Sequence, residues 1–420
     1  MYKLEAKKST FLGNVIVLLT GTGIAQIVPI LVAPFLSRLY TPEDFGVLAL
    51  YLSILQILGS IINLRYEMAI VLPKSKRESL ALVLIGLYVA IAGSILLFSI
   101  VSIFNNNITS ILGNNKISPW LYVIPFNIFL IGFFNILNYY NTRIKQFKEI
   151  AKSNIVKSTA NSCIQVLLGV FKFNSGLIIG QLFSSFLGNY SLSKTLYKEK
   201  EILKTFTRNE LWSIAKRYRK FPIYSTWGTF LNTFSLNCSN FFINAIYTLS
   251  QLGYYSYGYK YLSLPVSLIG NSVSQVYVQK AAEERNEFGN CKDLFISTFK
   301  KLLFISLAIF SLLFFIVEDL FAFIFGEQWR IAGRFAKIMI PLVFIRFIST
   351  PLSTTITVFE HQKLALLCHS ILFILTLLSP LLSYTLNLEI ESFLYLNTWI
   401  LFFYHVGLLL LIYNISLGKK

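Results

Sequence analysis

Charged residues are scarce in this chain of 420 residues. Asp, Glu, Lys and Arg make up 13% of it, whereas a soluble globular protein carries about 25%. Too little polar surface is therefore left to coat a soluble particle of this size. A large soluble all-α protein is disfavoured because apolar runs of about 20 residues, long enough to span a bilayer, recur from end to end. The sequence predicts an all-α integral membrane protein.

Cysteine, histidine and acidic residues are also few. The four cysteines and three histidines show no CxxC or mixed Cys/His ligand spacing, and no P-loop, H-E-x-x-H or G-x-S-x-G motif is present. We therefore expect no enzyme, no catalytic residues, no metal and no cofactor. Without an ATP site, energy would come from an ion gradient, the substrate gradient or consumption of the product. The net charge of +18 is typical of basic cytoplasmic loops rather than of nucleic-acid binding.

Twelve apolar stretches follow one another along the chain. Because a backbone in lipid must satisfy its own hydrogen bonds, each stretch is predicted to be a transmembrane helix. No small-residue cleavage site follows the first, so it is interpreted as a retained helix rather than a removed signal. The stretches are 11–33, 45–64, 79–104, 119–140, 154–171, 175–193, 221–245, 253–278, 294–317, 333–359, 364–386 and 393–416.

Basic residues alternate between successive connections. The connections of one set, counted with both termini and with Lys157, hold 29 Lys and Arg, and the other set holds seven. Because basic loops stay in the cytoplasm, the alternation predicts a multi-pass protein with cytoplasmic N and C termini. We expect it in the bacterial inner membrane. The seven residues of the second set are Arg38, Lys116, Lys172, Lys260, Arg330, Arg334 and Lys337.

The longest connection, Ser193–Lys220, lies at the midpoint of the chain. Its nine basic residues alternate with apolar ones, a pattern typical of an amphipathic helix on the cytoplasmic lipid surface; a specific partner site is the alternative. We therefore predict an N-terminal six-helix bundle over residues 1–193, a basic amphipathic linker over 194–220 and a C-terminal six-helix bundle over 221–420.

The two halves show a weak internal repeat. At a shift of 207 residues, Phe35–Thr41 falls on Phe242–Thr248, and Gly21 falls on Gly228. Six helices per repeat is an even number, so both halves would run in the same direction through the membrane. Parallel repeats of this kind build transporters whose substrate site lies between the halves.

Several segments carry a family resemblance. Gly21–Ile27, Pro34–Gly46 and Arg65–Pro73, with Tyr247–Gly253 and Leu262–Pro265 in the second half, resemble the Wzx-type O-antigen and oligosaccharide flippases. These form the polysaccharide-transport branch of the MATE-like MOP superfamily. The resemblance implies two six-helix bundles that form a V around a central cavity.

The resemblance also implies a cargo and partners. The expected cargo is an undecaprenyl-diphosphate-linked oligosaccharide repeat unit, moved to the periplasmic leaflet by alternating access for O-antigen, lipopolysaccharide or capsule synthesis. Membrane lipids, a polysaccharide polymerase and a chain-length regulator are the other expected partners. The main alternative is a MATE-type ion-coupled drug or cation antiporter. A membrane polymerase or acyltransferase is disfavoured because no large periplasmic loop is present, and the repeat disfavours a purely structural scaffold.

Charges within or near the apolar stretches are the first candidates for substrate contact, because intramembrane charges are costly. Arg346 is surrounded by apolar residues, and its guanidinium can bind a phosphate bidentately; the alternative is packing, by snorkelling or by pairing with a carboxylate. Arg65 and Arg38 are further substrate-binding candidates, and Glu67 is the ion-coupling candidate. Since residues i and i+2 of a helix do not face each other, Arg65 and Glu67 are expected to have separate partners. The alternative is that both are charges at the membrane interface that only help to set the topology.

Uncharged polar residues complete the set of candidates. Gln26 and Asn63 can exchange hydrogen bonds with sugar hydroxyls, but most Asn and Gln within the apolar stretches are expected to join helices to one another. The five tyrosines between Tyr254 and Tyr261 favour either stacking on a glycan or an interfacial aromatic belt.

Overall fold

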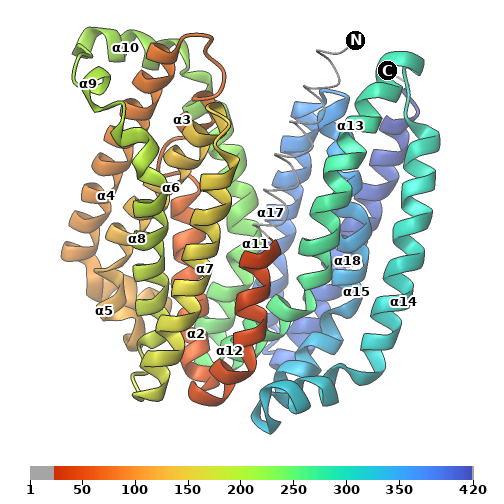
Figure 1. The fold of residues 1–420 in the computed structure, drawn as a ribbon. Coiled ribbons are helices and arrows are strands. Elements are labelled where there is room, and N and C mark those ends of the chain that lie inside the picture. The colour runs from red at the N-terminus through yellow and green to blue at the C-terminus, as the bar shows by residue number, and fades with distance from the viewer. Residues whose placement is uncertain (1–22, 419–420) are drawn as a thin grey trace. The chain divides into compact units, whose positions relative to one another are not determined.

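The computed structural model describes residues 23–418, which fold into helices and contain no β-strand. The chain divides into two compact units, Met1–Thr233 (unit 1) and Phe234–Lys420 (unit 2), most of whose longer helices are labelled in Figure 1. The first half of the first predicted helix, both chain ends and the repeat residue Gly21 lie outside the described residues.

Helices occupy every predicted apolar stretch within residues 23–418. In unit 1 they are Gly23–Leu39, α2 (Pro42–Gly59), α3 (Tyr66–Ala69), α4 (Lys76–Leu112), η1 (Asn115–Ile117), α5 (Ser118–Leu121), α6 (Ile124–Arg143), α7 (Phe147–Val170), α8 (Gly176–Tyr197), α9 (Lys200–Leu203), α10 (Arg208–Arg217) and η2 (Phe221–Ser225). The chain continues through α11 (Thr226–Ile246) into unit 2, with α12 (Leu249–Leu262), η3 (Val266–Gly270), α13 (Asn271–Phe288), α14 (Lys292–Phe325), η4 (Glu327–Trp329), α15 (Arg330–Leu352), α16 (Thr354–Val358), α17 (Gln362–Thr385) and α18 (Ile390–Ser416).

Some of these helices are long and apolar enough on their own to cross a membrane. Among the described residues five qualify, namely α2, α4, α14, α17 and α18, and a sixth is added if α6 and the η1–α5 segment before it, bent by 54°, form one span. Other helices, such as α7 and α15, carry polar or charged residues along their length. The chain is thus a multi-pass membrane protein with several apolar helices.

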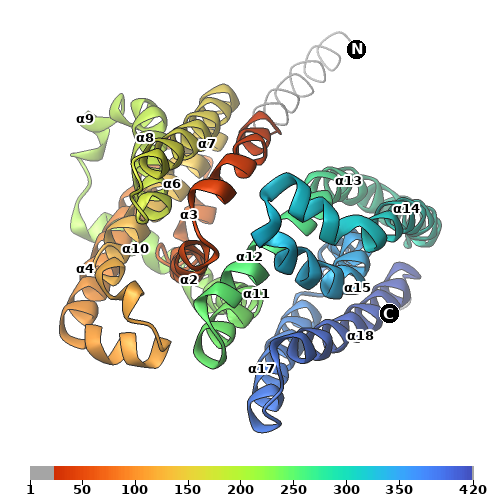
Figure 2. The same cartoon turned by 90° about the horizontal axis from the view of Figure 1, so that it is seen from below.

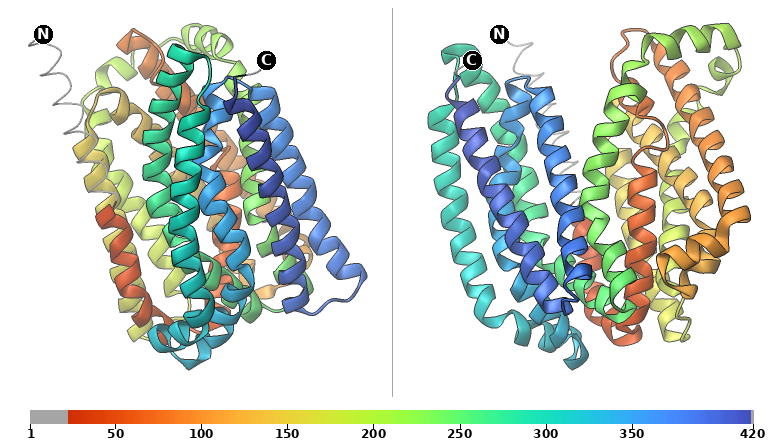
Figure 3. Two further views of the ribbon diagram at one scale, coloured as in Figure 1. Left: turned by 90° about the vertical axis from the view of Figure 1, so that its right-hand side faces the viewer. Right: turned by 180° about the vertical axis from the view of Figure 1, so that it is seen from behind.

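Each unit is organised around one central helix. In unit 1, α6 packs against α4 and α8, and α7 runs along α8 (Figure 2). In unit 2 the central helix is α15, which packs against α14, α18 and α12 (Figure 3). A Cβ on Gly333 of α15 would lie 2.7 Å from Glu318 Cα on α14, and one on Gly258 of α12 would lie 2.7 Å from Ala332 O on α15. Small residues therefore allow these backbones to approach closely, as in other membrane bundles.

The predicted repeat has a local counterpart in each unit. Thr41 caps α2 and Thr248 caps α12, each through a capping box that also engages the residue three positions later, which satisfies free backbone donors of the first turn. The preceding tyrosines also match: Tyr40 Oη donates to Gln165 O of α7 at 2.7 Å. Tyr247 Oη donates to Leu388 O, just after α17, at 2.9 Å. By these contacts α7 of unit 1 corresponds to α17 of unit 2.

The midpoint connection forms two short helices that lie on one end of unit 1. Apolar side chains of α9 and α10 pack against a buried cluster that includes Leu80 of α4 and Tyr140 of α6, whereas Trp212 remains 74% exposed. The apolar face predicted to meet lipid is therefore mostly covered by the protein itself, because α3, α4 and α6 present an apolar surface at this end. The packed linker residues are Ile202, Leu203, Phe206, Leu211, Ile214 and Ala215.

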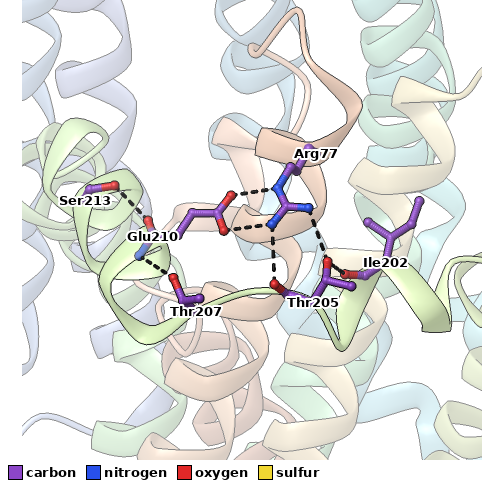
Figure 4. A network of polar contacts seen from close by, with 6 residues as sticks. All are labelled: Arg77, Ile202, Thr205, Thr207, Glu210 and Ser213. Atoms are coloured by element: carbon purple, nitrogen blue, oxygen red, sulfur yellow. Dashed lines mark hydrogen bonds and ion pairs between the residues drawn. The ribbon is translucent and has the colours of Figure 1, made fainter.

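Ion pairs hold the linker to the first turn of α4. Arg77 Nε and Nη2 donate to Glu210 Oε1 and Oε2 at 2.8 and 2.9 Å, and Arg77 Nη1 donates to Thr205 Oγ1 at 3.2 Å (Figure 4). The hydrogen bonds from Arg77 lower the pKa of the Glu210 carboxyl. Lys76 and Glu78, on either side of Arg77, pair in the same way with Glu199 and Arg217 at 2.7 Å.

Reversal of one charge at this site is expected to release the linker. In Arg77→Glu, two carboxylates would face each other, so backbone amides of α9 and α10 should exchange hydrogen faster, and Glu210→Arg in the same chain should restore protection. Lys204→Glu is the control, because Lys204 pairs only with Glu201 within the linker. Unchanged exchange in Arg77→Glu would show that apolar packing alone holds these helices.

Candidate functional site

Arg346 lies in the second half of α15 and is half-buried. Its Nη1 donates to Tyr259 Oη of α12, and its guanidinium carbon lies 5.9 Å from the centroid of the Tyr259 ring. One turn further on, Ser349 Oγ lies 3.1 Å from His405 Nδ1 of α18. Arg346 is therefore surrounded by neutral hydrogen-bonding groups and makes no ion pair within residues 23–418.

The other basic residues of α15 are neutralised. Arg330 pairs with Asp319 and Glu327, both at 2.5 Å, Arg334 Nη1 lies 3.4 Å from Glu391 Oε1, and Lys337 Nζ lies 2.9 Å from Glu318 Oε1. Arg346 alone among the basic residues of this helix has no carboxylate partner in the described chain. The alternative of a packing ion pair is not realised, and guanidinium donors remain available for an anion.

Arg65 and Glu67 are brought together, contrary to the expectation of separate partners. Leu64 and Arg65 have φ values of 47° and 62°, in the left-handed region, so helix geometry does not apply there. Arg65 precedes the short helix α3, and its Nη1 lies 3.2 Å from Glu67 Oε1, with the side chains 20% and 2% exposed. Glu67 Oε2 and Arg65 Nε are buried without a hydrogen-bond partner in the described chain.

Burial raises the pKa of the Glu67 carboxyl, and the Arg65 charge opposes this only in part. A carboxyl with a raised folded-state pKa holds its proton at pH values where the unfolded chain has lost it. Its contribution to stability is therefore largest below the ordinary value of 4.5 and falls as the pH rises through the folded-state pKa.

Glu67→Gln is expected to remove this part of the pH dependence. The wild-type melting temperature should fall as the pH rises from about 4.5 towards the raised pKa, whereas the variant should change less over the same window. Melting of the purified protein in detergent measures this. If the melting temperatures of the two proteins changed with pH in the same way, Glu67 would not be the group responsible for this pH dependence.

The remaining predicted residues lie in three different settings. Asn63 is buried, and its Nδ2 donates to Gly86 O of α4 at 3.2 Å, so it joins two segments of unit 1. Arg38 is exposed, and its Nη1 donates to Pro34 O of its own helix, at 3.3 Å, and to no other group within residues 23–418. Gln26 lines a polar cavity with residues of α7 and α8.

Asn and Gln side chains mostly join helices, as expected. Asn127 Nδ2 of α6 donates to Tyr51 Oη of α2 at 2.9 Å. Asn189 Nδ2 of α8 donates to Leu130 O of α6 at 2.8 Å. Gln165 Nε2 of α7 donates to Leu177 O of α8 at 2.9 Å.

The tyrosines of α12 are largely packing residues. The Tyr257 ring lies 4.2 Å from the Trp329 ring and 5.0 Å from the Phe325 ring, between centroids, and Tyr254 meets Trp329 edge to face at 5.9 Å. Tyr259 differs because its hydroxyl meets Arg346. Most tyrosines of α12 thus pack within unit 2, and Tyr259 contacts the guanidinium of Arg346.

Lys157 was missed as a candidate because it was counted with a cytoplasmic connection. The structure starts α7 at Phe147, so Lys157 lies ten residues into the helix, about 15 Å along its axis. It is half-buried and forms no ion pair within residues 23–418. The signal was present in the sequence, since position 157 already lay inside the fifth apolar stretch, 154–171.

Comparison with solved structures defines the class of fold. The lipid II flippase MurJ in an inward closed conformation aligns with a TM-score of 0.73 at 17% identity, covering 94% of this chain and 90% of that one. An inward-facing multidrug resistance transporter of the MATE family aligns with a TM-score of 0.71 at 13% identity, covering 96% of both chains. A MOP superfamily transporter from Pyrococcus furiosus aligns with a TM-score of 0.60 at 13% identity, covering 96% and 95%. The chain has the fold of MOP superfamily transporters.

The family follows from the sequence itself. The profile of a family described as polysaccharide biosynthesis protein matches residues 35–333, which is more than half of the chain. The chain therefore belongs to this family, and the predicted resemblance to the Wzx-type branch of the MOP superfamily is confirmed. No curated protein matches the sequence.

Proposed function

We propose that the protein is a flippase that moves undecaprenyl-diphosphate-linked oligosaccharide repeat units from the cytoplasmic to the periplasmic leaflet of the bacterial inner membrane. Alternating access would drive the movement, for synthesis of O-antigen or capsule. The observation that carries the proposal is Arg346, a cation on a central helix of a MOP-type fold without a carboxylate partner in the described chain. A diphosphate would supply the negative charge that Arg346 lacks as a partner.

The topology belongs to the same proposal. Twelve transmembrane helices with both termini in the cytoplasm would form bundles over residues 1–193 and 221–420, joined by the linker 194–220. Support comes from the matched contacts of Tyr40 and Tyr247 and from the basic linker on one end of unit 1. A polysaccharide polymerase and a chain-length regulator are the proposed partners.

A deletion strain tests the proposed function. Loss of the protein should abolish surface polysaccharide and trap lipid-linked repeat units in the inner leaflet, where a membrane-impermeant glycosidase added to spheroplasts cannot reach them. A MATE-type drug or cation antiporter predicts instead unchanged polysaccharide and an altered drug sensitivity. Arg346 and Lys157 argue against that alternative because unpaired cations repel a cationic cargo.

A further inference from the structure

The polar cavity of unit 1 is positively charged and has no acidic residue among the described residues that line it. It has a volume of about 290 Å³ and lies between the helix Gly23–Leu39, α7 and α8. Lys157 is its one charged lining residue, and the Phe134 ring, whose centroid lies 4.8 Å from Lys157 Nζ, is the aromatic neighbour of the ammonium group. A cation within a membrane helix is costly; the Phe134 ring offsets part of this cost, and a bound anion would offset more.

The other lining groups suit a hydroxylated ligand. The side-chain amides of Gln26, Asn154 and Gln181 make no hydrogen bond within residues 23–418, and Asn161 Oδ1 is buried and accepts none there. The free NH₂ groups can donate to an anion, while Asn161 Oδ1 requires a donor such as a sugar hydroxyl. An anion without a hydroxyl group would leave that last group unsatisfied.

The fold does not require a charge at this place. The counterpart of α7 in unit 2, by its tyrosine contact, is α17, and α17 carries no charged residue after Lys363. Lys157 is therefore a charge that the corresponding helix of unit 2 lacks beyond its first turn. Function rather than packing accounts for it best.

We propose that this cavity binds the anionic part of a sugar, either a glycosyl phosphate or an acidic sugar, with Lys157 as its charge partner. The inference rests on the proposed function for the nature of the cargo. It adds a second cationic contact, in unit 1, to the contact proposed for Arg346 in unit 2.

Direct binding to the full-length protein in nanodiscs tests the proposal, with a short-chain prenyl-diphosphate-linked N-acetylglucosamine as the probe. Lys157→Met should weaken binding about tenfold or more, because charge-assisted hydrogen bonds are lost, and Lys157→Arg should retain most of it. Lys152→Met is the matched control, since Lys152 is exposed on the same helix. Gln181→Leu keeps the charge, removes one amide and should weaken binding less.

Competition identifies the source of the charge. Inhibition of probe binding by inorganic pyrophosphate that is weaker in Lys157→Met would assign the phosphate, and inhibition by glucuronic acid would assign a carboxylate. Wild-type affinity in Lys157→Met, both for this probe and for its counterpart that carries glucuronic acid, would overturn the proposal. If the wild-type protein binds the probe through Lys157 but moves no lipid-linked sugar in proteoliposomes, the proposed function fails and the site stands. If the protein moves lipid-linked sugar but Lys157→Met binds the sugar probes as the wild type does, the proposed function stands and the Lys157 site fails.

Discussion

Arg346→Ala is expected to reduce flipping of lipid-linked oligosaccharide in proteoliposomes at least tenfold, with normal expression and folding. A bidentate guanidinium–phosphate contact comprises two charge-assisted hydrogen bonds of about 1.5–3 kcal/mol each, and each 1.4 kcal/mol corresponds to a factor of ten. Arg346→Lys should retain part of the activity because the charge remains while the planar fork is lost.

The control for Arg346 lies on the same helix. Arg334→Ala removes an arginine that is exposed and paired with Glu391, so transport should stay near the wild-type rate. Tyr259→Phe is informative as well, since it removes the hydroxyl that contacts Arg346 and keeps the ring. Full export by Arg346→Ala with normal expression would exclude a role for Arg346 in binding phosphate.

Arg65→Asn is expected to destabilise the protein by about 3 kcal/mol at a pH above the raised pKa of Glu67, where the carboxyl is ionised. Removal of one partner of a buried ion pair costs about 3–5 kcal/mol, and the lower end applies because the Arg65 side chain is 20% exposed. Asparagine is chosen because it tolerates the left-handed backbone at this position. Equilibrium unfolding in mixed micelles measures the difference.

A double-mutant cycle separates the ion pair from other effects of the substitution. In a Glu67→Gln background, the carboxyl that needs Arg65 is absent, so Arg65→Asn should cost less than about 1 kcal/mol. The same cost in both backgrounds would show that Arg65 acts through other contacts, such as that with Met68 Sδ at 2.8 Å. The pairing also means that Arg65 is engaged by the protein and is a weaker candidate for phosphate than Arg346.

The helices and the repeat were readable from the sequence for clear physical reasons. Apolar runs of bilayer length leave the backbone no alternative to helix, so each predicted stretch within residues 23–418 contains a helix, although some helices are bent or end earlier than predicted. The alignment of Phe35–Thr41 with Phe242–Thr248 placed Thr41 and Thr248 at equivalent positions, and both turned out to cap helices. Such local signals depend on a few neighbouring residues.

The candidate site was less predictable because it depends on backbone detail and on distant partners. The residue types at Leu64 and Arg65 do not predict a left-handed backbone at either position, so the pairing of Arg65 with Glu67 could not be predicted from the sequence. The isolation of Arg346 required knowledge of where Asp319, Glu318 and Glu391 lie. Lys157 was assigned to a cytoplasmic connection because charge counting does not distinguish a lysine near the end of a connection from one inside the following helix.

Movement of the lipid-linked sugar between leaflets is the decisive measurement. Cells depleted of the protein would be fed a radiolabelled sugar, so that labelled repeat units are made on the cytoplasmic leaflet, then converted to spheroplasts and treated with an impermeant glycosidase. We expect depletion to leave the labelled glycan protected in the inner leaflet and the wild-type gene to restore its cleavage, whereas Arg346→Ala does not. Equal cleavage with and without the protein would show that the protein is not the flippase.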